Sequence, residues 1–126
     1  MTKEPINKYF GTPMSEWIDR VPNELDVDAV GLWQIIPVGI EDFGLVGEHL
    51  EDFSRRCILA LLQRGAIPVR PASTSDKCWE PETAYRGSHE EIANQIIEEW
   101  NAGKLIPDHD GLWFYRFNDS VLTASD

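Results

Sequence analysis

Residues 44–65 read GLVGEHLEDFSRRCILALLQRG, and this stretch decides most of the fold. Its apolar side chains recur every three or four residues, which places them along one face of a helix. The members of this stripe are Val46, Leu50, Phe53, Cys57, Ile58, Leu61 and Leu62. Acidic side chains come early and arginines come late, as the helix dipole favours. The pattern predicts a helix between Gly44 and Gly65, with Gly65 as its left-handed C-terminal cap.

A second helix is predicted over residues 88–102. Ser88 and Glu91 form a capping box, in which the Ser88 hydroxyl accepts from the Glu91 amide and the Glu91 carboxylate accepts from the Ser88 amide. The apolar residues that follow lie on one helical face. They are Ile92, Ala93, Ile96, Ile97 and Trp100. The helix is expected to end near Gly103.

Two strands are expected around this helix. Residues 67–70 (IPVR) are short and apolar, and Pro68 suits an edge position because proline has no amide proton to donate. Residues 112–117 (LWFYRF) are aromatic and predict a strong final strand. The segment 71–87, rich in Ser, Thr and Pro, is expected to be a long loop, and residues 120–126 a loose tail.

The N-terminal part predicts a short helix over residues 13–21. Thr12 is a suitable N-cap, and Pro13 suits the first helical position. Pro22 and Asn23 are expected to stop this helix.

Residues 26–36 (DVDAVGLWQII) fit either a buried strand or a short helix. We expect helix before Gly31 and an extended segment over residues 32–36. Pro37 and Gly39 should end this element.

Together these elements predict an α+β domain, with three or so helices packed on a small sheet of two to three strands. The length of 126 residues and the 42% hydrophobic content favour one globular domain over residues 1–126. No window is apolar enough for a signal peptide or a membrane span, so we expect a cytoplasmic protein. The two cysteines, Cys57 and Cys78, are expected to stay reduced there.

The net charge of -11 argues against nucleic acid and membrane surfaces as partners, because both are bound through Lys and Arg. The charge is uneven. Residues 1–52 carry 11 acidic and 3 basic side chains, residues 53–89 carry 3 and 6, and residues 90–126 carry 8 and 2. The two acidic blocks serve either solubility alone or the steering of a basic partner. Whether they lie together is open at this stage.

Catalytic and cofactor signatures were not found, and we assign no cofactor and no bound metal. There is no G-x-S-x-G, no Gly-rich phosphate loop, no H-E-x-x-H and no paired C-x-x-C. Asp108-His109-Asp110 supports one alternative, a small metal-binding protein or enzyme, although consecutive turn residues point in different directions. A second alternative is a homodimeric assembly subunit that associates through residues 112–117.

Five tryptophans are many for this length. Trp17, Trp33, Trp100 and Trp113 each fall on an apolar face and are expected in the core. Trp79 lies with Tyr85 in the predicted loop beside acidic residues, a composition typical of interface hot spots. Packing that orders the loop is the competing explanation.

In size, acidity, tryptophan content and lack of a catalytic motif, the chain resembles bacterial immunity proteins, such as those paired with contact-dependent or other polymorphic toxins. The resemblance implies a non-enzymatic inhibitor that binds a basic nuclease toxin one-to-one and covers its positive cleft. Trp79 and Tyr85 would be the anchors of such an interface. The acidic residues expected to supply its field are Glu41, Asp42, Glu48, Asp52, Glu98, Glu99, Asp108 and Asp110.

Overall fold

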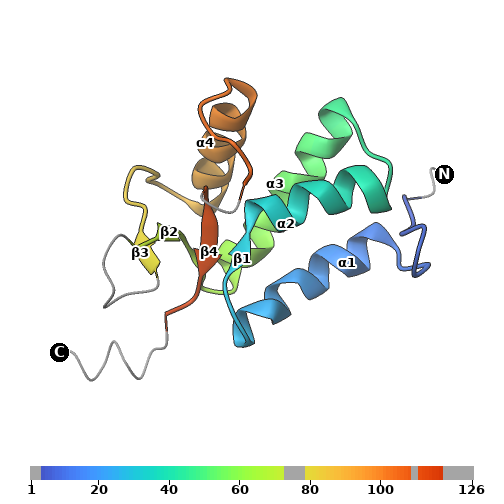
Figure 1. Cartoon of the computed structure of the whole chain (residues 1–126), viewed down its shortest axis with the longest axis horizontal. Helices are drawn as coiled ribbons and strands as arrows, with labels where there is room; N and C mark the ends of the chain where they lie inside the picture. The colour runs from blue at the N-terminus through green and yellow to red at the C-terminus, as the bar shows by residue number, and fades with distance from the viewer. Residues whose placement is uncertain (1–3, 73–78, 109–110, 118–126) are drawn as a thin grey trace.

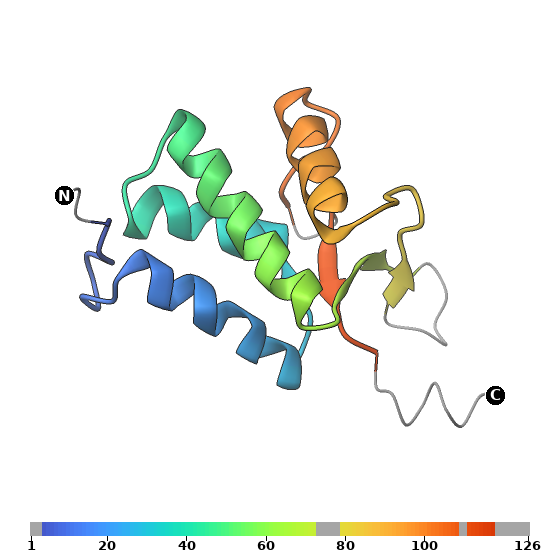
Figure 2. The ribbon, with the colours of Figure 1, turned by 180° about the vertical axis from the view of Figure 1, so that it is seen from behind.

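The computed structural model describes residues 4–72, 79–108 and 111–117, and within them it shows an α+β fold (Figure 1). Its α-helices are α1 (Met14–Arg20), α2 (Leu32–Pro37), α3 (Gly47–Gln63) and α4 (His89–Asn101). A 3-10 segment, η1 (Val21–Asp26), continues α1, and a π-helical segment, η2 (Val38–Asp42), continues α2. Seen from behind, α3 runs between α1 and α4 and contacts both (Figure 2).

The sheet has four strands, one or two more than expected. They are β1 (Val30–Gly31), β2 (Ile67–Pro71), β3 (Trp79–Pro81) and β4 (Trp113–Tyr115). Their order is β1-β4-β2-β3, and every neighbouring pair is antiparallel. The expectation of a structureless loop over 71–87 was wrong at β3, because these three residues pair with the end of β2.

The long central helix is confirmed. Phe53, Cys57 and Leu61 are fully buried along its inner face. Gly65 has a φ of 94° and ends the helix as predicted, with its amide bonded to the Leu62 carbonyl at 3.0 Å. Val46 departs from the predicted stripe because it precedes the first turn and is 73% exposed.

The predicted capping box of α4 is also confirmed. The Glu91 amide donates to the Ser88 hydroxyl at 3.1 Å, and the Ser88 amide donates to the Glu91 carboxylate at 3.1 Å. Ala93, Ile96 and Ile97 are buried on the inner face, as the spacing predicted.

The first helix begins differently from the prediction. Thr12 is not the N-cap, because Pro13 holds that position and the Glu4 carboxylate accepts from the Ser15 amide at 3.0 Å. The α-helix ends at Arg20, just before Pro22, as predicted, but the chain continues as the 3-10 segment η1. Pro22 lies in the first turn of η1, where its missing amide proton leaves no intrahelical bond unmade.

The assignment within residues 26–36 was the wrong way round. Val30 and Gly31 are extended and pair with β4, whereas Leu32 begins a helix. The buried residues Leu32, Ile35 and Ile36 lie at helical spacing, so one face of α2 meets the core. The chain stays helical through Pro37 and Gly39 and leaves helix only after Asp42.

Proline was expected at a sheet edge, but Pro68 lies in an inner strand. Its carbonyl accepts from the Glu82 amide at 2.8 Å. Because N and O of a strand residue point to the same side, the proline nitrogen faces the end of β3 and not β4. On its other side β2 pairs with β4. Since β4 is paired on both sides, a homodimer formed by strand addition at residues 112–117 would have to displace β1 or β2.

One hydrophobic core links the helices to the sheet, and Phe53, Ile58, Ile96 and Phe114 are fully buried in it. The four tryptophans expected in this core are only partly buried: Trp17 and Trp100 pack against its margin, whereas Trp33 and Trp113 contact each other outside it. No helix within the described residues is long and apolar enough to cross a membrane. The predicted tail, 120–126, lies outside the described residues.

Candidate functional site

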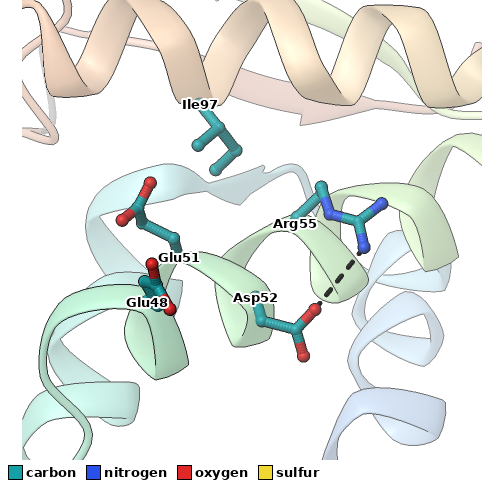
Figure 3. Close-up of a pocket in the computed structure, with 5 residues that line it drawn as sticks. All are labelled: Glu48, Glu51, Asp52, Arg55 and Ile97. Atoms are coloured by element: carbon teal, nitrogen blue, oxygen red, sulfur yellow. Dashed lines mark hydrogen bonds and ion pairs between the residues drawn. The ribbon is translucent and has the colours of Figure 1, made fainter.

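A hollow of about 270 Å³ opens between the first half of α3 and the last turns of α4 (Figure 3). We call it the α3–α4 hollow. It is lined by Glu48, Glu51, Asp52, Arg55 and Ile97. Figure 3 shows Ile97 pointing from α4 toward the polar side chains of α3. Two of the predicted site residues, Glu48 and Asp52, thus meet here, together with Glu51, which was not predicted.

The local sequence explains why α3 presents carboxylates at this place. Phe53 and Cys57 turn inward, so residues 48, 51 and 52 fall on the outer side of the same helix. Glu48 lies in the first turn, where the positive end of the helix dipole stabilises an anion.

The carboxylates of the hollow are only weakly neutralised. Asp52 lies 3.5 Å from the guanidinium of Arg55 and 4.0 Å from that of Arg56, and both pairs are exposed to solvent. Exposed pairs of this kind contribute little to the stability of the fold, about 0 to 1 kcal/mol. Glu51 accepts from Asn101 of α4 at 2.5 Å. No cation among the described residues pairs with Glu48. The lining therefore keeps a negative balance of three carboxylates to one guanidinium.

The hydrogen bond between Glu51 and Asn101 also shows where the two acidic blocks of the sequence meet. It joins the acidic start of α3 to the acidic end of α4, so the blocks adjoin along this helix pair. Glu98 is exposed on α4, and Glu41 is exposed at the end of η2.

Two other predicted acids have structural roles. The Asp42 carboxylate accepts from the side-chain amide of Asn7 at 3.0 Å, and Asn7 is 2% exposed. The Glu99 carboxylate accepts a hydrogen bond from the Tyr85 hydroxyl. Burial, this hydrogen bond and the neighbouring carboxylates raise the pKa of the Tyr85 phenol well above its usual range. Asp42 and Glu99 therefore make hydrogen bonds within the fold and are assigned a structural role.

The two predicted aromatic anchors have different surroundings. Trp79 lies in β3, with its ring centroid 4.9 Å from that of Trp113 and 6.4 Å from that of Tyr115. Tyr85 packs against the core beside α4. Both side chains are half-buried, so part of each remains on the surface.

The Asp108-His109-Asp110 cluster is described only in part. Asp108 is exposed and closes a turn through its carbonyl, which accepts from the Gly111 amide at 3.0 Å. His109 and Asp110 lie outside the described residues. Within the described residues, no group of three or more His, Cys, Asp or Glu is placed to hold a metal ion.

Sequence reasoning missed an aromatic row along the sheet. Ring contacts run from Trp33 to Trp113 at 6.0 Å, from Trp79 to Trp113 and Tyr115, and from Tyr115 to Phe117 at 4.9 Å. The alternation of residues 113, 115 and 117 carries the signal, because these side chains lie on one face of a strand. Trp113 also lines a second hollow, with Trp17, Glu24 and Asp28.

No protein-family model, curated protein or solved structure matches the chain. A functional proposal therefore rests on the contacts and charges of the described residues.

Proposed function

We propose that this chain is a small acidic binding protein that neutralises a basic protein partner, and that the partner is a nuclease toxin inhibited one-to-one. The observation that carries the proposal is the α3–α4 hollow, where Glu48, Glu51 and Asp52 gather against a single arginine. A nuclease must hold a phosphate backbone in a positive cleft. A negative surface of matching extent can occupy that cleft.

The exposure of Glu48 and Asp52 supports binding over folding as their role. The ion pairs of Asp52 are solvent-exposed and contribute little to stability. A concentrated surface charge instead raises the rate of encounter with an oppositely charged protein and orients it on arrival.

The first experiment identifies the partner and then tests its effect. The tagged chain is purified from its source organism, and a stoichiometric partner is identified by mass spectrometry. The expected partner is strongly basic, cleaves nucleic acid by itself, and loses that activity at one equivalent of this chain. A stoichiometric partner that is neutral or acidic, or a nuclease that stays active in the complex, contradicts the proposal.

The second experiment tests the surface. The triple variant E48Q/E51Q/D52N should slow association with that partner by about 10- to 100-fold at low salt, because electrostatic steering supplies rate factors of that order. The control E16Q/D19N/E90Q removes the same number of charges elsewhere on exposed helix positions. Equal slowing by both variants, or no slowing by either, would refute the α3–α4 hollow as the binding surface.

A further inference from the structure

The second hollow has a volume of about 440 Å³ and lies between η1 on one side and β1 with α2 on the other. We call it the η1–β1 hollow. The buried side chains of Val21 and Ile35 form its floor. The half-buried rings of Trp17 and Trp113 and the exposed carboxylates of Glu24 and Asp28 complete its lining. It therefore combines an apolar base, aromatic surface and negative charge.

Both rings are held in place by other aromatic side chains. The Trp17 ring centroid lies 5.5 Å from that of Phe53 and 6.3 Å from that of Phe43. The Trp113 ring contacts Trp33 at 6.0 Å and Trp79 at 4.9 Å. Rings fixed before binding lose little conformational entropy when a ligand arrives.

Within the part of the chain that the structure describes, no cation pairs with the carboxylates of this hollow, although Arg20 lines an adjoining hollow with Glu24. The nearby Arg20 pairs with Glu16 at 2.6 Å, and Arg116 pairs with Asp26. One oxygen of Asp28 accepts from the Ala29 amide at 2.7 Å, which fixes the orientation of that carboxylate. Among the described residues, no ion pair reaches Glu24 or Asp28. The charge of the hollow is thus available to a cation from outside.

A guanidinium fits this lining better than an ammonium. It is planar, stacks on aromatic rings and donates two parallel hydrogen bonds to a carboxylate. An ammonium is a compact, strongly hydrated point charge that gains less from an indole face. The stem of an arginine side chain would cover the apolar floor while its head reaches the acids.

We propose that the η1–β1 hollow receives an arginine side chain of the basic partner. The source of that arginine rests on the proposed function, whereas the chemistry of the hollow does not. This hollow would select the side chain that enters, and the α3–α4 hollow would supply a steering field.

The chemistry of the hollow is tested without any partner. N-acetylarginine amide is titrated into the ¹⁵N-labelled full chain, and the indole N–H resonances of the five tryptophans are followed. The resonances of Trp17 and Trp113 should shift in a saturable way, and that of Trp100 should not. N-acetyllysine amide should bind more weakly, and the uncharged isostere N-acetylcitrulline amide should not bind. Uniform shifts of all five, or equal binding of citrulline and arginine, would overturn the site.

Matched variants then connect the hollow to the partner. E24Q/D28N should weaken arginine binding at least 5-fold, whereas the control E41Q/E90Q, also two exposed acids, should leave it unchanged. The same E24Q/D28N variant should lower the affinity for the basic partner about 10-fold or more, the range of a charged interface contact. Retained affinity would remove the partner as the source of the arginine. Since the arginine titration needs no partner, failure of the proposed function and failure of this site give different results.

Discussion

The α3–α4 hollow and the η1–β1 hollow both carry negative charge, but they differ in what holds that charge. Three carboxylates of the first stand on one helix beside a single aliphatic side chain, Ile97. The second sets two carboxylates beside two tryptophan rings that are fixed by their neighbours. A charged surface without a shaped pocket, such as the α3–α4 hollow, steers and orients a partner. Charge beside fixed rings discriminates between side chains, so the two hollows suit different steps of one association.

A similar contrast separates the acidic residues themselves. Asp42 and Glu99 bond groups from distant parts of the chain, whereas Glu48 and Asp52 face solvent. Substitution of the first pair should therefore change stability, and substitution of the second should change binding alone.

The largest effect is expected where both hollows share a support. Phe53 is fully buried in α3, and its ring centroid lies 5.5 Å from that of Trp17 and 5.6 Å from that of Phe43. Phe53→Ala should lower the free energy of unfolding by about 3 to 5 kcal/mol, the range for a buried phenylalanine. Urea unfolding measures it, with Val46→Ala as the exposed control. A loss below about 1 kcal/mol would mean that the core relaxes around the site.

A smaller loss is expected at the structural acid Asp42. Asp42→Ala leaves the side-chain amide of Asn7 without its acceptor, and Asn7 is 2% exposed. An unsatisfied buried donor costs about 1 to 3 kcal/mol of unfolding free energy. Asp42→Asn keeps an acceptor oxygen at the same place and should restore most of that loss. If alanine and asparagine behave alike in urea unfolding, the bond to Asn7 does not stabilise the fold.

The bond between Tyr85 and Glu99 should contribute about 1 kcal/mol, so Tyr85→Phe should lose about that much. The pH dependence follows from the raised pKa of the phenol. Above the ordinary tyrosine pKa of about 10, the unfolded chain releases this proton while the folded chain keeps it, so stability falls as pH rises.

Burial raises the pKa of the Cys57 thiol as well. The unfolded chain therefore releases the thiol proton first, and the loss of stability begins near the ordinary thiol pKa of about 8.5. Urea unfolding between pH 8 and 11 should show wild type losing stability throughout, and Tyr85→Phe losing less of it above pH 10. Parallel curves for the two proteins would show that the Tyr85 phenol does not contribute to the alkaline loss.

These contacts also show how far the sequence predicts this molecule. The helix over 47–63, its glycine cap at Gly65 and the capping box at Ser88 follow from residues within a few positions of one another. The two-residue strand β1 and the three-residue strand β3 have no such pattern. They exist because β4 and β2 offer backbone partners from distant parts of the chain.

The candidate site residues also fall into two groups, those placed by local spacing in the sequence and those placed by long-range contacts. Helical spacing places Glu48 and Asp52 on one outer face, so their proximity follows from the sequence. The structural role of Asp42 depends on Asn7, which lies 35 residues away. The η1–β1 hollow brings Trp17 together with Trp113. No local pattern reveals contacts of that range.

The smallest change in stability is expected at Asp52, and it is the one that separates binding from folding most cleanly. Asp52→Asn removes the pairs with Arg55 at 3.5 Å and Arg56 at 4.0 Å, whose side chains are 37% and 40% exposed. Pairs this open to water should shift the free energy of unfolding by less than about 0.5 kcal/mol. The same substitution should still slow association with the basic partner, since it removes one carboxylate from the α3–α4 hollow. Thermal unfolding and stopped-flow association on the same preparation decide it. A variant that loses more than about 1 kcal/mol of stability while binding at the wild-type rate would reverse the assignment and make Asp52 a structural acid like Asp42.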